Sequence, residues 1–478
     1  MNKVELMRRC SVGEPVVIIG AGASGVLSAI ALLRSSDRHV VLVERDGSWS
    51  TGPAYATSDP RHLLNVPAGK LSVDSTQPCD FVDWASARIG GVSPATFLPR
   101  SLYGGYLRAA LDAAERGSAP GALTKVTAEA VGLERVCAPR RDRVRMRVTF
   151  ADGRSIDGAQ IVLALGNPPS RALACEGDAV IDDPWSVCAS PLVSADDAVV
   201  IVGSRLTAVD VALSLAGRGH RGSIRMVSRY GLLPAAHGEH AVVPAPLPDL
   251  PPALTARALV AWFRAAIAET GDWRAVFDAI RPRTNEIWRA LPEAERKRLL
   301  RHVLRHWEVH RHRMAPDVAH AVGALVESGR VEVVAGVVTG VACGPHGTSR
   351  VIVRDPRGAR TTLDAHRVVN CAGASFDLRR SPTPLVRQLL DRGLARPGPL
   401  GLGLDVTADG SLVDAAGRAS SAVSVVGPLR RGAEWETTAI PEIRAHAESL
   451  ARRLASGPRP VAHSVRGVAG SRPVMTSS

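Results

Sequence analysis

The stretch VVIIGAGASG, residues Val16–Gly25, decides the fold. Four apolar residues typical of a buried strand run into the glycine turn Gly20-x-Gly22-x-x-Gly25, and a helix-like apolar run follows. Gly20 permits a tight turn, Gly22 lets the backbone approach a pyrophosphate, and Gly25 lets the helix pack close to the strand. Free N–H groups and the helix dipole then favour phosphate at the helix N-terminus. The pattern predicts a dinucleotide-binding β-α-β unit.

A second apolar strand, VVLVE, ends in Glu44. In such units an acid about 20 residues beyond the turn binds the ribose hydroxyls. The uncharged run from Val16 to Leu33, preceded by Arg8 and Arg9, would also suit a signal peptide or a membrane span. The spaced glycines and the strand ending in Glu44 argue against that alternative, so we expect no association with a membrane.

Length and composition favour a globular protein of two or more domains. The chain has 478 residues, 45% of them hydrophobic, and a net charge of +13. Its seven cysteines form no CxxC pair, which indicates neither a disulfide framework nor a zinc site and fits a reducing cytoplasm. The basic stretches carry no aromatic interleaving and no nucleic-acid motif. We therefore interpret the charge as a mild attraction for anionic cofactors and substrates, not for nucleic acid.

A second dinucleotide-like unit begins at Ala198. The strand AVVIVGS leads into a turn, an apolar helix-like run follows to Arg218, and a further strand, SIRMVSR, follows that. A unit inserted in this way is typical of flavoproteins with two dinucleotide sites. We expect an α/β fold of two Rossmann-like domains, the NAD(P)H unit inserted in the FAD unit. The predicted bounds are 12–175 and 336–456 for the FAD-binding domain, 176–335 for the NAD(P)H-binding domain with a helical insertion at about 250–328, and 457–478 for a disordered tail.

Five blocks of sequence resemble one family. They are GAGASG from Gly20, GPAYATSDPRHLLNVPAGKLS from Gly52, GSRLTAVDVALSLAGRGHRGSIRMVSRYGLLP from Gly203, WEVHRHRMAP from Trp307 and GPLRRGAEWETTAIPEIRAHA from Gly427. The chain resembles the FAD/NAD(P)-binding oxidoreductases that include FAD-dependent urate hydroxylases and N-hydroxylating enzymes of the nitrosuccinate synthase type.

The resemblance implies an FAD-dependent monooxygenase. NADPH, or else NADH, would reduce FAD, and O₂ would be used to oxygenate a small polar substrate. N-hydroxylation of an amino acid is the first expectation and ring hydroxylation of a heterocycle the second. A dehydrogenase or oxidase that uses no nicotinamide, and a non-catalytic flavin-binding partner protein, remain as alternatives. The sequence does not indicate the oligomeric state.

The resemblance also implies the cofactor contacts. For FAD they are Gly20, Gly22, Ser24 and Gly25 at the phosphates, Glu44 at the ribose, Leu64, Val66 and Pro67 along the isoalloxazine, and Gly427, Thr437 and Thr438 at the pyrimidine or ribityl side. For NAD(P)H they are Gly203, Ser204, Arg205 and Thr207, with Ser228 and Arg229 near the adenosine ribose. Arg229 could pair a 2′-phosphate, which favours NADPH, although Tyr230 replaces a second arginine. Arg205 stands where the family has a glycine. It either turns outward and pairs with phosphate or leaves a site that binds NAD(P)H poorly.

Two groups of residues are candidates for catalysis and substrate binding. Asn65 could orient the flavin or serve as a turn residue before Pro67, and Lys70 could place a positive charge beside the flavin or lie idle at the surface. The substrate candidates are Arg283, Asn285 and Trp288, which also suit an ordinary amphipathic helix, and His310, Arg311 and Arg313, because an arginine fork binds carboxylates. His302, His306 and His310 recur on one predicted helix face, but no acid completes the set and we expect no metal.

Overall fold

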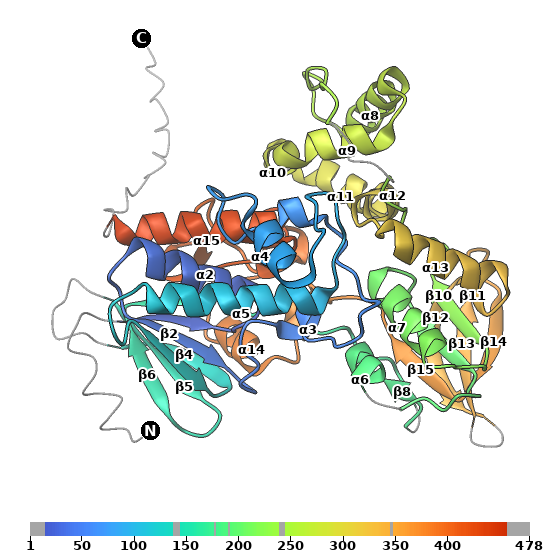
Figure 1. Ribbon diagram of the computed structural model, residues 1–478, viewed down its shortest axis with the longest axis horizontal. Coiled ribbons are helices and arrows are strands. Elements are labelled where there is room, and N and C mark those ends of the chain that lie inside the picture. Colours follow the sequence, from blue (N-terminus) through green and yellow to red (C-terminus); the bar gives the residue numbers. More distant parts are fainter. Residues whose placement is uncertain are drawn as a thin grey trace, which may run out of the picture.

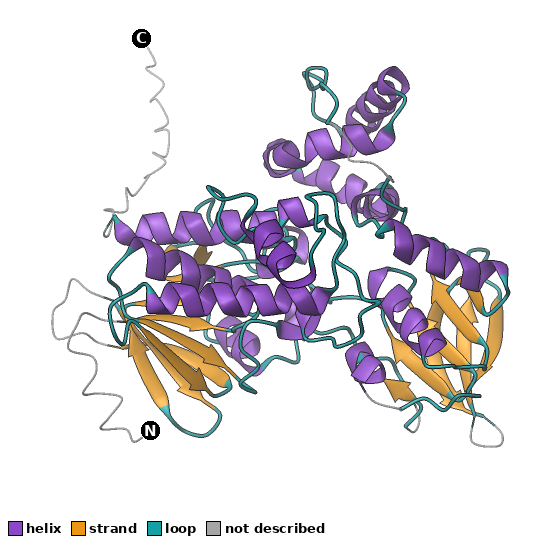
Figure 2. Ribbon diagram, viewed as in Figure 1, coloured by secondary structure: helices purple, strands orange, loops and turns teal. Residues whose placement is uncertain are grey.

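The computed structural model describes residues 15–136, 144–175, 178–189, 192–238, 244–344 and 348–456. These form two α/β units and a group of helices that projects beside them (Figure 1). Both units combine helices with strands (Figure 2). The tail predicted at residues 457–478 lies outside the described residues.

The first unit is built on a six-stranded sheet in the order β16-β17-β7-β1-β2-β3. Its strands are β1 (Val16–Ile19), β2 (Val40–Glu44), β3 (Leu123–Thr127), β7 (Gln160–Leu163), β16 (Ser411–Val413) and β17 (Ala419–Val425). Every neighbouring pair is parallel except β16 and β17. Strand β1 lies inside the sheet and all four of its residues are buried, which is why its sequence is continuously apolar.

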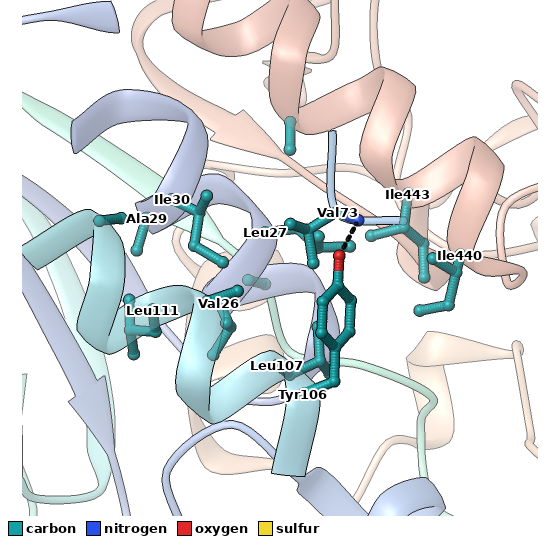
Figure 3. Packing of buried hydrophobic residues seen from close by; sticks show 14 of the residues in the cluster. Val26, Leu27, Ala29, Ile30, Val73, Tyr106, Leu107, Leu111, Ile440 and Ile443 are labelled. Atoms are coloured by element: carbon teal, nitrogen blue, oxygen red, sulfur yellow. Dashed lines mark hydrogen bonds between the residues drawn. The ribbon is translucent and has the colours of Figure 1, made fainter. Parts of the chain in front are cut away.

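Both faces of this sheet are covered. Helices α2 (Ala23–Ser35), α5 (Arg100–Arg116) and α15 (Ile440–Ala455) pack on one face, where Val26, Leu107 and Ile443 share one hydrophobic core (Figure 3). Within that core the Tyr106 hydroxyl accepts a hydrogen bond from the backbone N–H of Val73 at 3.1 Å. The other face carries α14 (Pro384–Asp391) and an antiparallel sheet of β4 (Ala130–Val136), β5 (Arg145–Phe150) and β6 (Ser155–Gly158).

The second unit is built on a parallel five-stranded sheet in the order β11-β10-β9-β15-β8. Its strands are β8 (Val180–Ile181), β9 (Val199–Val202), β10 (Ile224–Ser228), β11 (Val331–Ala335) and β15 (Arg367–Asn370). Helices α6 (Pro184–Ala189), α7 (Leu206–Gly217) and α13 (Pro316–Glu327) cover one face. The antiparallel strands β12 (Val337–Cys343), β13 (Ser349–Arg354) and β14 (Arg360–Ala365) cover the other.

The chain returns to the first unit later than the predicted residue 336. Strand β15 pairs with β9, and Val351 and Val368 share a core with Val200 of the second sheet. The return therefore follows Asn370. Helix α13 also lies within the predicted insertion, yet Val318 and Val322 pack into the core of the second sheet. Pairing between distant strands fixes both boundaries, and local sequence does not carry that information.

The projecting group consists of α8 (Ala256–Thr270), α9 (Trp273–Ile280), α10 (Thr284–Ala290), α11 (Glu293–His302) and α12 (Leu304–Arg311). We call these five helices the helical insertion. Thr255 caps α8 by accepting from the N–H of Ala258, and Asp272 caps α9 by accepting from that of Arg274.

The helix break at Val303 corrects the prediction of one continuous histidine face. His302 ends α11, whereas His306 and His310 lie on α12. Among the described residues, no group of three potential ligands is placed to hold a metal ion.

The short elements are α3 (Gly52–Tyr55), α4 (Asp80–Ile89), η1 (Ala68–Lys70), η2 (Arg281–Arg283), η4 (Leu378–Arg380), η5 (Pro399–Gly401) and η6 (Pro428–Arg430). Within the described parts of the chain, no helix combines the length and apolarity that crossing a bilayer requires.

Candidate functional site

The first glycine turn is fixed by two close backbone approaches. Gly20 has φ +100°, and a Cβ there would lie 2.4 Å from the carbonyl oxygen of Ala164. A Cβ on Gly25 would lie 1.8 Å from the carbonyl oxygen of Gly20. Gly22 is the N-cap of α2, and this helix start has neither a side-chain cap nor an acid in its first turn. Such a terminus offers unpaired N–H groups to an anion.

Glu44 lies over this turn. One carboxylate oxygen accepts from the N–H of Ala21 at 2.7 Å and the other from the N–H of Arg45 at 2.9 Å. The acid predicted to bind ribose is thereby held at the mouth of the predicted phosphate site.

The part of the chain after Asn370 that returns to the first unit, called the returning segment below, closes the same turn. Gly427 has φ +87°, and a Cβ there would lie 2.3 Å from the Oγ of buried Ser24. Thr437, just before α15, is 1% exposed, and among the described residues its hydroxyl has no hydrogen-bond partner. A buried hydroxyl without a partner is costly, so it suits a bound ligand. Thr438, which follows it, is partly buried. The first glycine turn, Glu44 and Gly427 thus lie together and suit the pyrophosphate and ribose of FAD, while the contacts predicted for Thr437 and Thr438 stay predictions.

The segment predicted to follow the isoalloxazine is pinned to its neighbour. Leu64 and Val66 are buried, and Pro67 is partly buried. The N–H of Leu64 donates to the carbonyl of Leu98 at 2.8 Å. Alternate residues of this segment therefore point into the core of the first unit.

His237 fixes the backbone of Asn65, a role that the sequence prediction missed. Its Nε2–H donates to the carbonyl oxygen of Asn65 at 3.0 Å. Burial and the nearby charge of Arg313 lower the pKa of His237 to about 4, so the ring is neutral near pH 7. The only sequence signal for His237 is its place just after the block that starts at Gly203.

A charged cluster, of which Arg313 is the buried member, lies beside this segment. It consists of Lys70, Asp278 and Arg313; the Lys70 Nζ is 3.6 Å from Asp278, and the Arg313 guanidinium donates to the same carboxylate. Arg313 is only 4% exposed, and its Nε and Nη1 have no hydrogen-bond partner in the described structure. Burial lowers the pKa of Lys70, and the charges of Arg281 and Arg313 add to that effect. Asn65, Lys70 and Arg313 are thus brought together around donors suited to an anion.

The other predicted substrate residues mostly hold the helical insertion to the returning segment. Buried Arg311 donates to both carboxylate oxygens of Glu436, at 3.1 and 2.8 Å. The Oδ1 of Asn285 accepts from the N–H groups of Trp435 and Glu436, both at 2.8 Å. The indole N–H of Trp288 donates to the carbonyl of Gly432 at 2.9 Å.

Two further candidates lie apart from the charged cluster. Arg283 pairs with Glu286 at 3.3 Å near the surface. His310 packs edge-on against Trp273, with ring centroids 4.7 Å apart. Their predicted substrate contacts stay predictions.

The second glycine turn repeats the construction of the first. Gly203 has φ +121°, and a Cβ there would lie 2.2 Å from the carbonyl oxygen of Cys371, just as Gly20 meets Ala164. The third glycine position is occupied by buried Ala208, a replacement that this fingerprint accepts.

Side chains around the second turn are also in place. The Oγ of Ser204 lies 2.6 Å from the carbonyl oxygen of Leu232 and 2.8 Å from the Oγ of Ser228. Thr207 is partly buried in the first turn of α7. The start of α7, like that of α2, has no side-chain cap and no acid in its first turn.

Arg205 extends from the second turn to the helical insertion. It is the N-cap residue of α7, and its guanidinium forms an ion pair with Glu308 of α12. Glu308 is buried and also lies 3.1 Å from Arg431 and 3.6 Å from His312. The side chain thus leaves the tight turn, and its predicted contact with a pyrophosphate stays a prediction.

Arg229 lines a cleft at the end of β10. The cleft has a volume of about 380 Å³, and its walls include Tyr230, Arg354 and Asp355. Two guanidinium groups and one carboxylate leave a net positive charge there. This balance suits the 2′-phosphate that the sequence prediction assigned to Arg229.

Comparison with known proteins agrees with the cofactor site predicted at the first glycine turn. Residues 17–168 match a family model described as FAD-NAD(P)-binding. This part of the chain is an FAD/NAD(P)-binding domain. A search of curated proteins finds no match.

Solved structures of similar fold cover almost the whole chain. The ornithine N-hydroxylase of Kutzneria sp. 744, determined with reduced FAD, NADP⁺ and L-ornithine, is 15% identical with a TM-score of 0.60, and the match covers 93% of this chain and 99% of that one. The FAD-bound cadaverine monooxygenase of Erwinia amylovora is 12% identical with a TM-score of 0.65, covering 98% and 100%. The thioredoxin reductase of Lactococcus lactis is 12% identical with a TM-score of 0.51, covering 93% and 98%. The two-domain flavoprotein fold predicted from the sequence is confirmed.

Proposed function

We propose that this chain is an FAD-dependent, NAD(P)H-using monooxygenase that N-hydroxylates a small amine bearing a carboxylate, with an amino acid as the first candidate. The observation that carries the proposal is the pair of unpartnered, buried N–H donors of Arg313, which lie in the charged cluster beside Asn65. The similar structures include enzymes named for ornithine and cadaverine, and both of these compounds are amines. Thioredoxin reductase shares the fold, but this sequence has no CxxC pair for dithiol chemistry.

The chain's residues divide the work of binding. The N-terminus of α2 would hold the FAD pyrophosphate, Glu44 the ribose and Thr437 the flavin side of the cofactor. When bound, FAD takes hydride from NAD(P)H and activates O₂. Arg229 would bind the adenosine end of NADPH through its 2′-phosphate. The protein then has to place the substrate amine beside the flavin and exclude bulk water.

The charged cluster would orient the substrate. Lys70 and Arg313 contribute two positive charges and Asp278 one negative charge, so the cluster carries a net +1 and accepts one carboxylate. Asp278 holds the Arg313 guanidinium, which leaves its Nε and Nη1 donors directed to a ligand. The neutral ring of His237 keeps the backbone of Asn65 in place next to this site.

A Lys70→Met variant tests the proposal, with Lys125→Met as the control, because Lys125 is a lysine on edge strand β3 that pairs with Glu115 and takes no part in the charged cluster. Lys70 is half exposed, so loss of its charge should raise KM for the preferred amino acid about tenfold, with a smaller change in kcat. The decarboxylated form of the same amine should be a poor substrate for both proteins. The assay measures hydroxylamine product together with NADPH oxidation. Equal activity on amines with and without the carboxylate would contradict the proposal.

Arg205 in the second turn favours one alternative, a flavin oxidase or dehydrogenase that uses no nicotinamide. It stands at the position where a glycine would admit the pyrophosphate, although its side chain extends to Glu308. Anaerobic mixing separates the two functions. Bleaching of the flavin by NADPH or NADH supports the monooxygenase, and bleaching by an organic substrate alone supports the oxidase.

A further inference from the structure

A large cavity lies within the helical insertion. Its volume is about 910 Å³, which is within the range of pockets that bind small organic ligands. Its walls come from α8 to α12, with Trp435 of the returning segment on one side. Among the described residues, those that line it include none from either glycine turn and none from the charged cluster. The cavity therefore shares no residue with the two glycine turns or the charged cluster, although Trp288 and His310, two of the sequence-predicted substrate residues, line it.

The walls concentrate the aromatic residues of the chain. Only 4% of all residues are aromatic, yet five of the eight tryptophans line this cavity. Phe263 and Phe277 have ring centroids 5.2 Å apart, and Phe277 and Trp307 have theirs 5.1 Å apart. Phe263, Trp273 and Trp307 remain partly exposed despite their size. Covering these ring faces with an alkyl chain or a flat ring removes apolar surface from water and so favours binding.

The charged residues lining the cavity have one sign. They are Arg257, Arg264, Arg298 and Arg305, and within the described part of the chain no Asp or Glu lines it. Arg298 pairs with Glu295, whereas the exposed Arg257 and Arg264 have no acidic partner among the described residues. Walls of this kind attract and orient an anion.

Helix α9 separates the cavity from the charged cluster. Trp273, Phe277 and Ile280 line the cavity. Asp278 is one residue further along than Phe277 and does not line the cavity, and it meets Lys70. The two sites therefore lie on neighbouring faces of one helix, and the cavity-lining Trp273 ring has its centroid 5.9 Å from the Arg313 guanidinium.

We infer that this cavity binds an amphipathic anion: one carboxylate on an unbranched alkyl or flat aromatic body, with the body against the tryptophan and phenylalanine rings and the carboxylate at Arg257 and Arg264. The ligand occupies a site of its own, and its binding does not depend on the reaction proposed above.

Calorimetric titration of the FAD-loaded protein with sodium decanoate tests the inference, with decylamine hydrochloride as a probe of equal chain length and opposite charge. Decanoate should bind with one-to-one stoichiometry and roughly tenfold more tightly than decylamine. Ile267→Trp places an indole in the cavity and should weaken decanoate binding at least about tenfold. Val260→Trp, on another turn of α8, serves as the second filling variant if Ile267→Trp does not fold.

The double variant Arg257→Gln/Arg264→Gln tests whether these two arginines bind the carboxylate. This variant should raise the Kd of decanoate about three- to tenfold and reduce the difference in affinity between decanoate and decylamine. The matched control, Arg387→Gln/Arg452→Gln, removes two exposed arginines from α14 and α15 and should leave binding unchanged.

Three results would overturn the inference. One is a folded wild type that does not bind decanoate, and another is equal binding by the filled variants. The third is a wild-type dimer that becomes monomeric in Ile267→Trp without any ligand binding, since a second copy of the chain would then cover the cavity.

Discussion

Because Arg205 forms an ion pair with Glu308, the Glu308 carboxylate and the NADPH pyrophosphate would compete for the Arg205 guanidinium. Arg205 starts α7, where the pyrophosphate of NADPH would meet the helix N-terminus, and in the structure its side chain is bound to Glu308. If the guanidinium transfers to the pyrophosphate, Arg205→Ala should weaken NADPH binding. Glu308→Gln should strengthen it, because the competing carboxylate charge is gone.

The exposure of the Arg205 side chain sets the expected size of the change in NADPH affinity. A charge-assisted hydrogen bond is worth about 1.5–3 kcal/mol, but the Arg205 side chain is 56% exposed and the contact is screened by water. We therefore expect about 1 kcal/mol, or roughly a fivefold change in Kd, for each variant and in opposite directions. Glu308→Gln should also lower stability, because Arg431 and His312 lose the carboxylate beside them.

Stopped-flow reduction of the flavin, together with titration of NADPH, measures both effects. Arg221→Ala, which removes an exposed arginine paired with Asp196 in the same unit, is the control and should change neither quantity. FAD content should stay constant throughout. Faster reduction and tighter NADPH binding in Arg205→Gly would refute the reasoning, because the side chain would then block the site sterically. That outcome would favour the nicotinamide-independent alternative.

Three further predictions follow from single residues. Gly22→Trp should yield protein without FAD, seen as loss of yellow colour, because the indole would occupy the approach of the pyrophosphate to α2; full FAD retention would reject the assignment of this turn. Arg229→Ala should weaken NADPH by about 1.5–3 kcal/mol and leave NADH unchanged in parallel titrations, whereas equal losses would show that Arg229 does not contact the 2′-phosphate. Glu434 is buried, but hydrogen bonding to His446 and the charge of Arg430 lower its pKa from about 4.5 to about 2. The ionised Glu434 therefore contributes about 3 kcal/mol to the free energy of unfolding above about pH 4.5, and this contribution is lost as the pH falls toward about 2. In Glu434→Gln, the free energy of unfolding measured by urea denaturation should change less with pH across that window. An unchanged pH dependence would contradict the assignment.

Local sequence predicted the two glycine turns because their determinants are local. Gly20 and Gly25 meet within one turn of chain, and Glu44 ends the adjacent strand. The second turn was recognisable for the same reason, although Arg205 interrupts its pattern. Features that depend on residues close in sequence can thus be predicted from the amino-acid sequence alone.

The rest depends on contacts between distant parts of the chain. Lys70, Asp278 and Arg313 form one cluster although more than 200 residues separate the first from the second. The place of β15 in the second sheet comes from its pairing with β9, not from its own composition. A one-residue break at Val303 was enough to divide an otherwise regular histidine spacing.

The late return of the chain has a consequence for how the protein is made. One edge of strand β7 pairs with β17, and one side of α2 is covered by α15. Both β17 and α15 lie near the C-terminal end of the described chain. On a translating ribosome, all strands of the inserted unit emerge before β17 does. The inserted unit can therefore complete its sheet while the first unit still presents an open strand edge and a bare apolar helix. During that interval the open edge of β7 and the uncovered side of α2 expose the nascent chain to aggregation.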